Sequence, residues 1–538
     1  MSQYKILQVI GIISLILFTI TPVLNARYEI GTSIKSGDCI SQSVEPDMQV
    51  RLHKVGNTRL IVTNYGCYGV YRSDSYVDPE IGEVELSCEH PPGSQIENIF
   101  LAGLWIGGVV DGDTLVSVGV DGWENVFEMY ADSLPEGDIE ERSNNPADPY
   151  YHPDAVGELE YTAVYYDTLT DPNYVNPSDF DNRPHIPLGL KITESSYSWS
   201  NPEFEDFILF RYKIKNINSA YIEDMVLGLF FDCDILQVDM YPSGFDDDIA
   251  GHYSRFDPNS GKYVQMAWIA DNDGDPNGNT WDDGSVRSAL AISILDFPFM
   301  QDYAFNWYVS HAYQPGIFDW GPMQAENYRD FGTGGLGTPS GDRNKYYMMR
   351  NNEIDYDQIY SAVDYSGEGW LPPPVDPLLS DLPNGYDTKF LLSCGSLDLA
   401  PGDSVIFGFV LTVGDNFHQE PENFANLFDP DNPDAFYNTL DFSDLVSDVV
   451  AAQNLYDSIF LSDYLCGDAN YDGAIQIGDA VYIVNYVFLG GLPPYPFMSG
   501  DANCDDKVNI SDVIYLINYL FRNGFLPGDP DGDGIPDC

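Results

Sequence analysis

The chain carries one acidic segment twice near the end of its sequence. Residues 467–473 read GDANYDG, and residues 500–506 read GDANCDD, 33 residues further on. Each copy runs into an apolar stretch that ends in Asn-Tyr-x-Phe, at residues 485–488 and 518–521. An acidic loop followed by a helix, present twice, predicts a paired cation-binding module, because the crowded carboxylates of each loop need a positive ion between them.

The oxygen-bearing residues within each copy have the spacing of a calcium loop. Side-chain oxygens stand at loop positions 1, 3 and 5, a backbone carbonyl at 7 and a carboxylate at 12, which suits a hard cation that takes about six to eight oxygen ligands. The first loop offers Asp468, Asn470, Asp472, the carbonyl of Ala474, Gln476 through a water, and Asp479. The second offers Asp501, Asn503, Asp505, the carbonyl of Lys507, Asn509 through a water, and Asp512. The expected cofactor is Ca²⁺.

Residues 466–538 resemble a type I dockerin, the duplicated calcium-loop module that docks secreted proteins onto cohesin domains, best known from polysaccharide-degrading assemblies. Asp rather than Glu at position 12, and the lack of a helix leading into each loop, distinguish the segment from an EF-hand. The resemblance implies a cohesin-like protein partner. The second loop has Asp506 where the pattern has Gly. Because Asp adopts the left-handed conformation less readily than Gly, the second site is expected to be the weaker one.

The resemblance also places partner-binding residues at loop positions 10 and 11. Clostridial dockerins commonly carry a Ser-Thr pair there, whereas this chain has Ile477 followed by Gly478, and Ile510 followed by Ser511. The resemblance therefore implies partner contacts at Ile477, Ile510 and Ser511 that are more apolar than those of the clostridial relatives. Both isoleucines could instead belong to the core of the module itself.

The first 26 residues have the layout of a secretory signal. Lys5 precedes an apolar run over residues 6–20, and a short stretch leads to Ala26. A membrane anchor is the alternative, but the run is shorter than the roughly 20 apolar residues of a span. No later stretch is long and apolar enough, so the mature protein is expected to be secreted, extracellular or attached at the cell surface, with no membrane span after signal cleavage.

Eight cysteines fit an extracellular compartment but are too sparse for a small disulfide scaffold. Their pairing stays open at this stage. Cys538 could join Cys504 or Cys466, and bridges among Cys39, Cys67 and Cys88 are equally compatible with the sequence.

Acidic residues outnumber basic ones by 85 to 23, for a formal charge of -62. Such a field repels phosphate backbones and anionic membranes and concentrates divalent cations, so nucleic acid is excluded as a partner. A hydrophobic content of 44% supplies enough material for packed cores, which argues against a disordered chain.

The fold class is predicted as mainly β, with antiparallel sandwich domains and a small α-helical calcium-loop domain at the C-terminus. Short apolar or alternating runs between turn residues predict strands. These runs lie at residues 58–63, 99–110, 114–120, 159–166, 207–217, 225–231, 262–269, 289–295, 389–392 and 405–413. A helix is expected over residues 445–456, capped by Ser443 and Asp444. The expected domains are a signal at 1–26, β-rich domains at 27–195 and 196–460, and the dockerin-like domain at 466–538. The β-rich body also resembles large secreted bacterial proteins of unknown role.

Three further acidic stretches are candidate ion sites. Asp271, Asp273 and Asp275 alternate as calcium ligands do, although a solvated turn explains them equally well. In the tail, Asp529, Asp531 and Asp533 follow the same pattern more clearly and are expected to bind calcium. Residues 246–248 are three consecutive aspartates and are expected to form a solvated loop.

No motif identifies a catalytic site. The H-E-x-x-H and G-x-S-x-G patterns are absent, and the seven scattered histidines are expected to be structural. Glycoside hydrolysis needs only two carboxylates, which cannot be chosen from among 85 acidic residues. Several aromatic residues could stack on sugar rings, although burial in the core is the favoured role. They are Trp268, Trp281, Trp307, Tyr308, Trp320 and Trp370.

Two functions are compatible with these features. In the first, the chain attaches through its dockerin to a polysaccharide-degrading assembly, and the body binds polysaccharide or is itself a glycoside hydrolase that acts on O-glycosyl bonds. In the second, the chain is a non-catalytic cell-surface or extracellular-matrix protein, structural or adhesive, that uses the dockerin only for attachment.

Overall fold

The computed structural model describes residues 48–530 with internal gaps, so the expected signal at 1–26 lies outside the described residues. The gaps are residues 71–75, 78–81, 83, 122–126, 132–136, 176, 178–182, 241–243, 299–302, 310–320, 322–338, 340, 364–381, 462–463, 471–473, 490–493, 495–496, 506 and 523.

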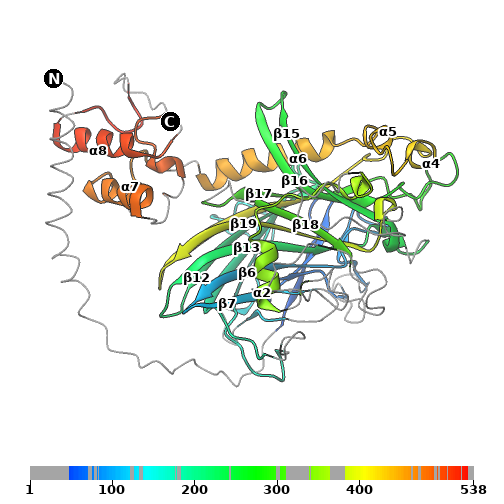
Figure 1. Cartoon of the computed structure of the whole chain (residues 1–538), viewed down its shortest axis with the longest axis horizontal. Coiled ribbons are helices and arrows are strands. Elements are labelled where there is room, and N and C mark those ends of the chain that lie inside the picture. Colours follow the sequence, from blue (N-terminus) through cyan, green and yellow to red (C-terminus); the bar gives the residue numbers. More distant parts are fainter. Residues whose placement is uncertain are drawn as a thin grey trace. The chain divides into compact units, whose positions relative to one another are not determined.

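Two large sheets form the body, and every pairing between their named strands is antiparallel (Figure 1). The first sheet has eleven strands. Its order is β14 (Leu236–Gln237), β5 (Ile96–Glu97), β4 (Cys88–Glu89), β2 (Arg59–Thr63), β3 (Cys67–Tyr68), β6 (Leu101–Val110), β13 (Ile222–Asp232), β19 (Thr388–Leu399) and β18 (Tyr303–Val309). In addition, β1 (Val50–His53) pairs with β2, and β7 (Asp113–Val118) pairs with β6.

The second sheet has nine strands. Its order is β15 (Asp248–Asp257), β16 (Lys262–Asp271), β17 (Ala289–Asp296), β20 (Ser404–Gly414), β12 (Phe207–Asn216), β11 (Leu190–Ser198), β10 (Leu159–Tyr166) and β8 (Tyr130–Ala131), and β9 (Glu140–Arg142) pairs with β10.

The main core lies between the two sheets. In β12 the apolar and polar residues alternate, so Phe210 points inward while Lys213 is exposed. The Phe210 ring stacks on Phe409 of β20 with centroids 4.6 Å apart, and it lies 5.0 Å from the ring of Tyr68, which belongs to the other sheet. The hydroxyl groups of Tyr68 and Tyr212 are also hydrogen-bonded. The body is therefore a sandwich with one shared interior.

Helices cover parts of the outer faces of both sheets. The helix α6 (Ser443–Tyr456) packs Leu445, Val449 and Tyr456 on the nine-stranded sheet. A Cβ atom at Gly408 of β20 would lie 2.6 Å from the Tyr456 hydroxyl, so only glycine fits beneath this ring. On the eleven-stranded sheet, α2 (Asp342–Met349) packs against Trp105 and its neighbours. The remaining short helices of the body are η4 (Gly244–Asp247), η5 (Gln358–Tyr360), η6 (Leu382–Asn384), α4 (Asn423–Leu427), α5 (Asp434–Tyr437) and η7 (Asp457–Leu461).

The β-rich fold class is confirmed, and each of the ten predicted strands overlaps an observed one. The expected division at residue 195 falls inside β11, and both sheets contain strands from each side of it, so the described strands on the two sides share one sandwich. The helix near 445–456 is confirmed, but its predicted caps are wrong. Phe442 occupies the N-cap position without a side-chain hydrogen bond, and Ser443 and Asp444 lie in the first turn. Within the described residues, none of the helices combines the length and apolar character that crossing a bilayer requires.

Two buried carboxyl groups predict a pH dependence of stability. Burial raises the pKa of Glu194 and of Asp448 to about 8. Each carboxyl accepts a hydroxyl hydrogen bond of 2.7 Å, Glu194 from Tyr165 and Asp448 from Thr412, and these bonds oppose the shift. Between the ordinary pKa of these carboxyl groups and the raised one, the folded state keeps two protons that the unfolded state has lost. Stability is expected to fall as pH rises from about 4.5 to about 8, by up to about 1.4 kcal/mol per pH unit for each group.

Urea unfolding near pH 5 and pH 8 checks this dependence. Glu194→Gln keeps an acceptor for Tyr165 and should flatten the profile, whereas Glu223→Gln, at an exposed position of β13, should leave it unchanged. Identical profiles for Glu194→Gln and the unmodified protein would contradict the assignment.

Candidate functional site

The two acidic loops lead directly into the two helices of the C-terminal module. The first precedes α7 (Ile477–Leu489) and the second precedes α8 (Ile510–Arg522), with the 3-10 turn η8 (Phe497–Gly500) before the second loop. The helices pack on each other around a small core. That core consists of Ala469, Ala480, Ile483, Ala502, Val508, Val513, Leu516 and Ile517.

The aspartate at position 12 closes each loop in the same way. In the first loop, Asp479 accepts the backbone N–H of Asn470 on Oδ1 at 3.2 Å and that of Gln476 on Oδ2 at 2.7 Å. Asp479 is fully buried in the first turn of α7. A carboxylate held by two backbone donors at the start of a helix is fixed in place across the loop. The first loop thus has the closure that a calcium loop requires.

The second loop repeats this closure and contains an oxygen without a hydrogen-bond partner. Asp512 accepts the backbone N–H of Asn503 at 3.3 Å and that of Asn509 at 2.8 Å. The Oδ1 atom of Asn503, at position 3, is shielded from solvent and has no hydrogen-bond partner in the described structure. Burial, with the charges of Asp501 and Asp505, raises the pKa of Asp512 to about 6. A hard cation would satisfy both the lone amide oxygen and the crowded carboxylates, so the residues present fit Ca²⁺.

The other predicted ligands differ in their burial and in their hydrogen-bond partners. Asp468 and Asp501 are buried, and Asp505 is exposed. Ala474, Gln476 and Lys507 are exposed. The Oδ1 atom of Asn509 accepts the N–H and hydroxyl of Ser511, at 2.9 and 2.7 Å, so it caps α8. In the tail, Asp529 is buried and its carbonyl accepts the hydroxyl of Tyr515. Asp472, Asp531 and Asp533 lie outside the described residues.

We expect Asp512→Ala to weaken calcium binding by the second loop about tenfold or more, because it removes a charged ligand and both loop-closing hydrogen bonds. Calorimetric titration of calcium into the full chain measures the effect. Ser511→Ala is the matched control, since it removes a hydroxyl one residue away without touching the carboxylate. Equal calcium affinity in the two variants would contradict the role of Asp512.

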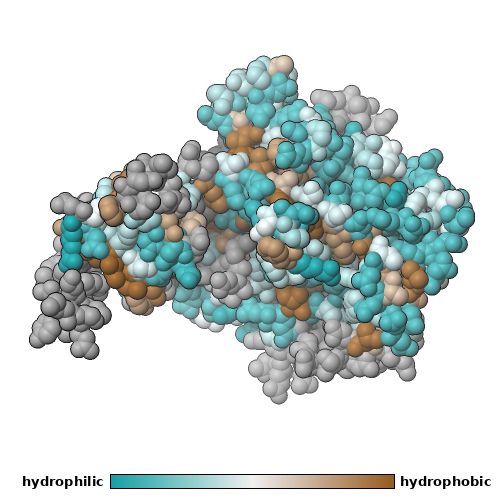
Figure 2. Space-filling model, turned by 90° about the horizontal axis from the view of Figure 1, so that it is seen from above, coloured by the Kyte–Doolittle hydropathy of each residue, from teal (hydrophilic) through white to brown (hydrophobic). Residues whose placement is uncertain are grey.

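The residues implied as partner contacts lie mostly against the module. Ile477 and Ile510 are partly buried and pack on its core, as the alternative reading allowed. Ser511 donates its hydroxyl to Asn509. The exposed apolar residues lie elsewhere, because Phe488 is 61% exposed and Phe521 is 65% exposed at equivalent positions of the two repeats. Figure 2 shows apolar side chains gathered on the surface of this module, on the left of the view. The repeated Asn-Tyr-x-Phe was the sequence signal for this pair.

The cysteines divide between the body and the module. Cys504 is disulfide-bonded, whereas Cys538 lies outside the described residues. In the body, Cys67 and Cys88 are buried free thiols, so a bridge between these two is wrong, and Cys39 lies outside the described residues. Burial raises the pKa of both thiols, which makes them unreactive.

His53 and three of the candidate aromatic residues are buried inside the body. His53 lies between the hydroxyl groups of Ser198 and Ser196, at 2.9 and 2.7 Å, and burial lowers its pKa to about 3. Trp268, Trp307 and Tyr308 are fully buried, which confirms the core role and excludes them as a platform for sugars. Trp281 is partly buried, whereas Trp320 and Trp370 lie outside the described residues.

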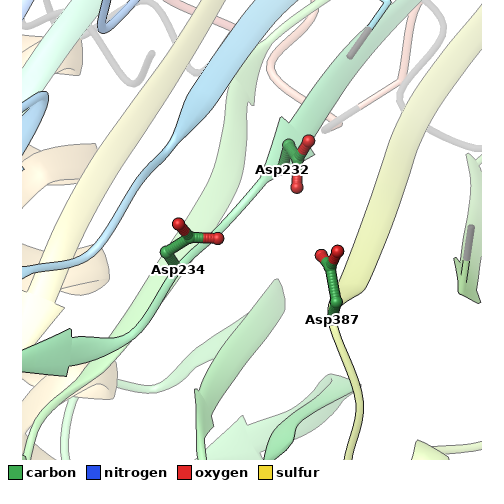
Figure 3. A group of neighbouring side chains, drawn as sticks. All are labelled: Asp232, Asp234 and Asp387. Carbon is green, nitrogen blue, oxygen red and sulfur yellow. The ribbon is translucent and has the colours of Figure 1, made fainter. Parts of the chain in front are cut away.

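A buried acidic group lies where β13 ends and β19 begins. The carboxylates of Asp232, Asp234 and Asp387 point toward one another, with oxygens within 4.8 Å (Figure 3). The ammonium of Lys389, itself buried, lies 3.1 Å from Asp232 and 2.7 Å from Asp387. Burial, with the charge of Asp232, raises the pKa of Asp234 well above its usual value. The group therefore contains its own counter-charge in Lys389, and sequence reasoning missed it because its members come from distant segments.

Residues 246–248 do not form the expected solvated loop. Asp246 is exposed, Asp247 is half-buried at the end of η4, and Asp248 is fully buried at the start of β15. Asp248 pairs in register with Asp271, the last residue of β16. Strand pairing thus brings this acidic stretch to the loop that contains Asp271, Asp273 and Asp275.

The two closed loops and their matching helices define a duplicated calcium-loop domain. Residues 466–521 match the dockerin type I domain family, so the chain carries a type I dockerin. Dockerins of this type bind calcium and attach proteins to cohesin partners. The resemblance predicted from the sequence is confirmed.

Two solved structures show a slight similarity to the chain. A candidate aldose 1-epimerase from Escherichia coli K12 is 10% identical, in a match that covers 69% of this chain and 100% of that protein with a TM-score of 0.23. The Slr1438 protein of Synechocystis sp. PCC 6803 is 7% identical, with coverage of 69% and 97% and a TM-score of 0.26. At these TM-scores neither likeness bears on function. No curated protein matches the chain.

Proposed function

We propose that the protein is secreted and attaches through its calcium-loaded dockerin to a cohesin-like receptor within a polysaccharide-degrading assembly. The observation that carries the proposal is the identical closure of the two loops by Asp479 and Asp512, together with the buried lone oxygen of Asn503. The signal-like layout of residues 1–26 supports secretion, and the family resemblance supports the link to polysaccharide breakdown.

The body could have either of two roles in such an assembly. A glycoside hydrolase would need two carboxyl groups that reach a sugar. Glu194 and Asp448, whose pKa values burial raises to about 8, instead bond to Tyr165 and Thr412. Together with the burial of Trp268 and Trp307, this favours the second candidate, a non-catalytic structural or adhesive protein displayed through its dockerin.

The receptor contact is assigned to the two exposed phenylalanines. Phe488 and Phe521 stand near the ends of α7 and α8, and they repeat with the duplication. Exposed aromatic residues that recur in this way are suited to bury against an apolar face of a partner. Because both helices start at the calcium loops, loss of the ion would also displace these side chains.

We expect the full chain to capture a cohesin-like receptor from the secreted fraction only with calcium, and the double change Phe488→Asp, Phe521→Asp to abolish capture. The control adds the same charges nearby, at Asn485 and Asn518 (Asn485→Asp, Asn518→Asp), and should retain capture. Affinity capture with mass spectrometry reads out the result. Binding that persists in chelator would overturn the calcium-dependent mode, and equal binding by both double variants would overturn the phenylalanine contact.

A further inference from the structure

The loop after β16 gathers acidic side chains at the edge of the sandwich. Asp271 is fully buried, and its Oδ1 atom accepts the backbone N–H of Asp273 at 2.9 Å and that of Gly274. The Oδ1 atom of Asp273 accepts the N–H of Asp275 at 2.8 Å. These bonds use one oxygen of each carboxylate to fold the loop and leave the second oxygen for another partner.

A fourth carboxylate comes from a separate segment. The register of β15 on β16 places Asp248 opposite Asp271, which brings Asp247 beside the loop. The charges of Asp247, Asp275 and Asp273 all act on Asp271 and, after burial, raise its pKa. Residues of η4 and of the loop after β16 thus form one acidic cluster.

Three oxygens in this acidic cluster are shielded from water and lack a hydrogen-bond partner in the described structure. They are Oδ2 of Asp271, Oδ2 of Asp275 and Oδ1 of Asp247. Native structures rarely bury a polar atom without a partner, because the lost hydration costs about 1–3 kcal/mol, and more for a charged group. Three such oxygens within one cluster indicate a partner that the described protein donors do not supply.

Among the described residues, no lysine or arginine pairs with any of these four aspartates. The neighbouring group around Asp232 and Asp387 shows the contrast, since Lys389 supplies a positive charge there. Two acidic groups in one sandwich thus differ in whether the chain provides their counter-charge.

We propose that Asp247, Asp271, Asp273 and Asp275 bind one divalent cation, with Ca²⁺ favoured because every donor is a hard oxygen. The ion joins η4 to the end of β16 and is additional to the ions of the dockerin. Its role is to hold this edge of the sandwich together in the way that Lys389 does for the neighbouring group.

Terbium luminescence separates this site from the dockerin. The ring of Trp281 lies 3.1 Å from the position that a Cβ atom on Gly274 would take, so it is close enough to sensitise an ion in the loop. Residues 466–538 contain no tryptophan. In the full chain, excitation at wavelengths that only tryptophan absorbs should therefore report terbium in the body, and added calcium should quench the emission by competition.

The double change Asp273→Asn, Asp275→Asn should weaken terbium binding about tenfold or more, and Asp247→Asn alone should weaken it through the distant segment. Asp283→Asn, at an exposed position nearby, should leave it unchanged, as should Asp512→Ala in the dockerin. Circular dichroism of each variant verifies that the body is folded. The proposal is overturned if the unmodified chain gives no calcium-displaceable emission under tryptophan excitation, or if folded Asp247→Asn binds terbium as tightly as the control.

Discussion

Replacing Lys389 with methionine is expected to destabilise the body by about 3–5 kcal/mol, which is a large part of the stability of an ordinary domain. The ammonium is almost fully buried and lies 3.1 Å from Asp232 and 2.7 Å from Asp387. Methionine fills a similar volume but leaves these two carboxylates without a counter-charge. Urea unfolding of the full chain measures the loss.

Lys213→Met is the matched control for this change, because Lys213 is exposed on β12. It should alter stability by less than about 0.5 kcal/mol. Equal stabilities for the two variants would show that the Asp232 group does not depend on Lys389.

Removal of calcium is expected to unfold the C-terminal module. Among its described residues, eight buried apolar side chains form its core, and its loops bring carboxylates such as Asp501 and Asp512 together. A unit of this size has little hydrophobic stabilisation of its own, so the binding free energy of the ions is also folding free energy. Circular dichroism of residues 466–538 should lose the signal of α7 and α8 in chelator and regain it with calcium.

Magnesium in place of calcium is the control for that experiment, because it demands a tighter octahedral site than these loops offer. A helical signal that survives chelation would contradict the prediction.

The sequence predicted strands well where one face of the strand is polar. The bounds of β10 were predicted as observed, because its residues alternate between buried and half-buried. In contrast, β11 was missed because it carries Glu194, Ser196 and Ser198, which read as loop residues. All three are buried, and partners from other strands satisfy them: Tyr165 bonds Glu194, and His53 bonds both serines. Such compensation depends on tertiary contacts that no local pattern reveals.

The candidate sites also differ in whether they lie within one segment or depend on tertiary contacts. The dockerin loops lie within short contiguous segments, so their spacing alone predicted the closing roles of Asp479 and Asp512. The acidic cluster in the body could be predicted only in part. Asp271, Asp273 and Asp275 lie within one short segment, but Asp247 is brought beside them by the pairing of β15 with β16. The exposure of Phe488 and Phe521 likewise depends on how the two helices pack.

The two sheets of the body can be completed only after β19 and β20, the last strands in the sequence, have been synthesised. β19 lies between β13 and β18, and β20 lies between β17 and β12, so each sheet receives an inner strand from the last part of the body. A chain that stops before residue 388 would expose four unpaired strand edges, which are templates for aggregation. The body therefore has to remain soluble as an incomplete sandwich until residue 414 is available. The long-range pairings predict slow folding for the sandwich, whereas the dockerin, built from local contacts, can fold quickly once calcium is present.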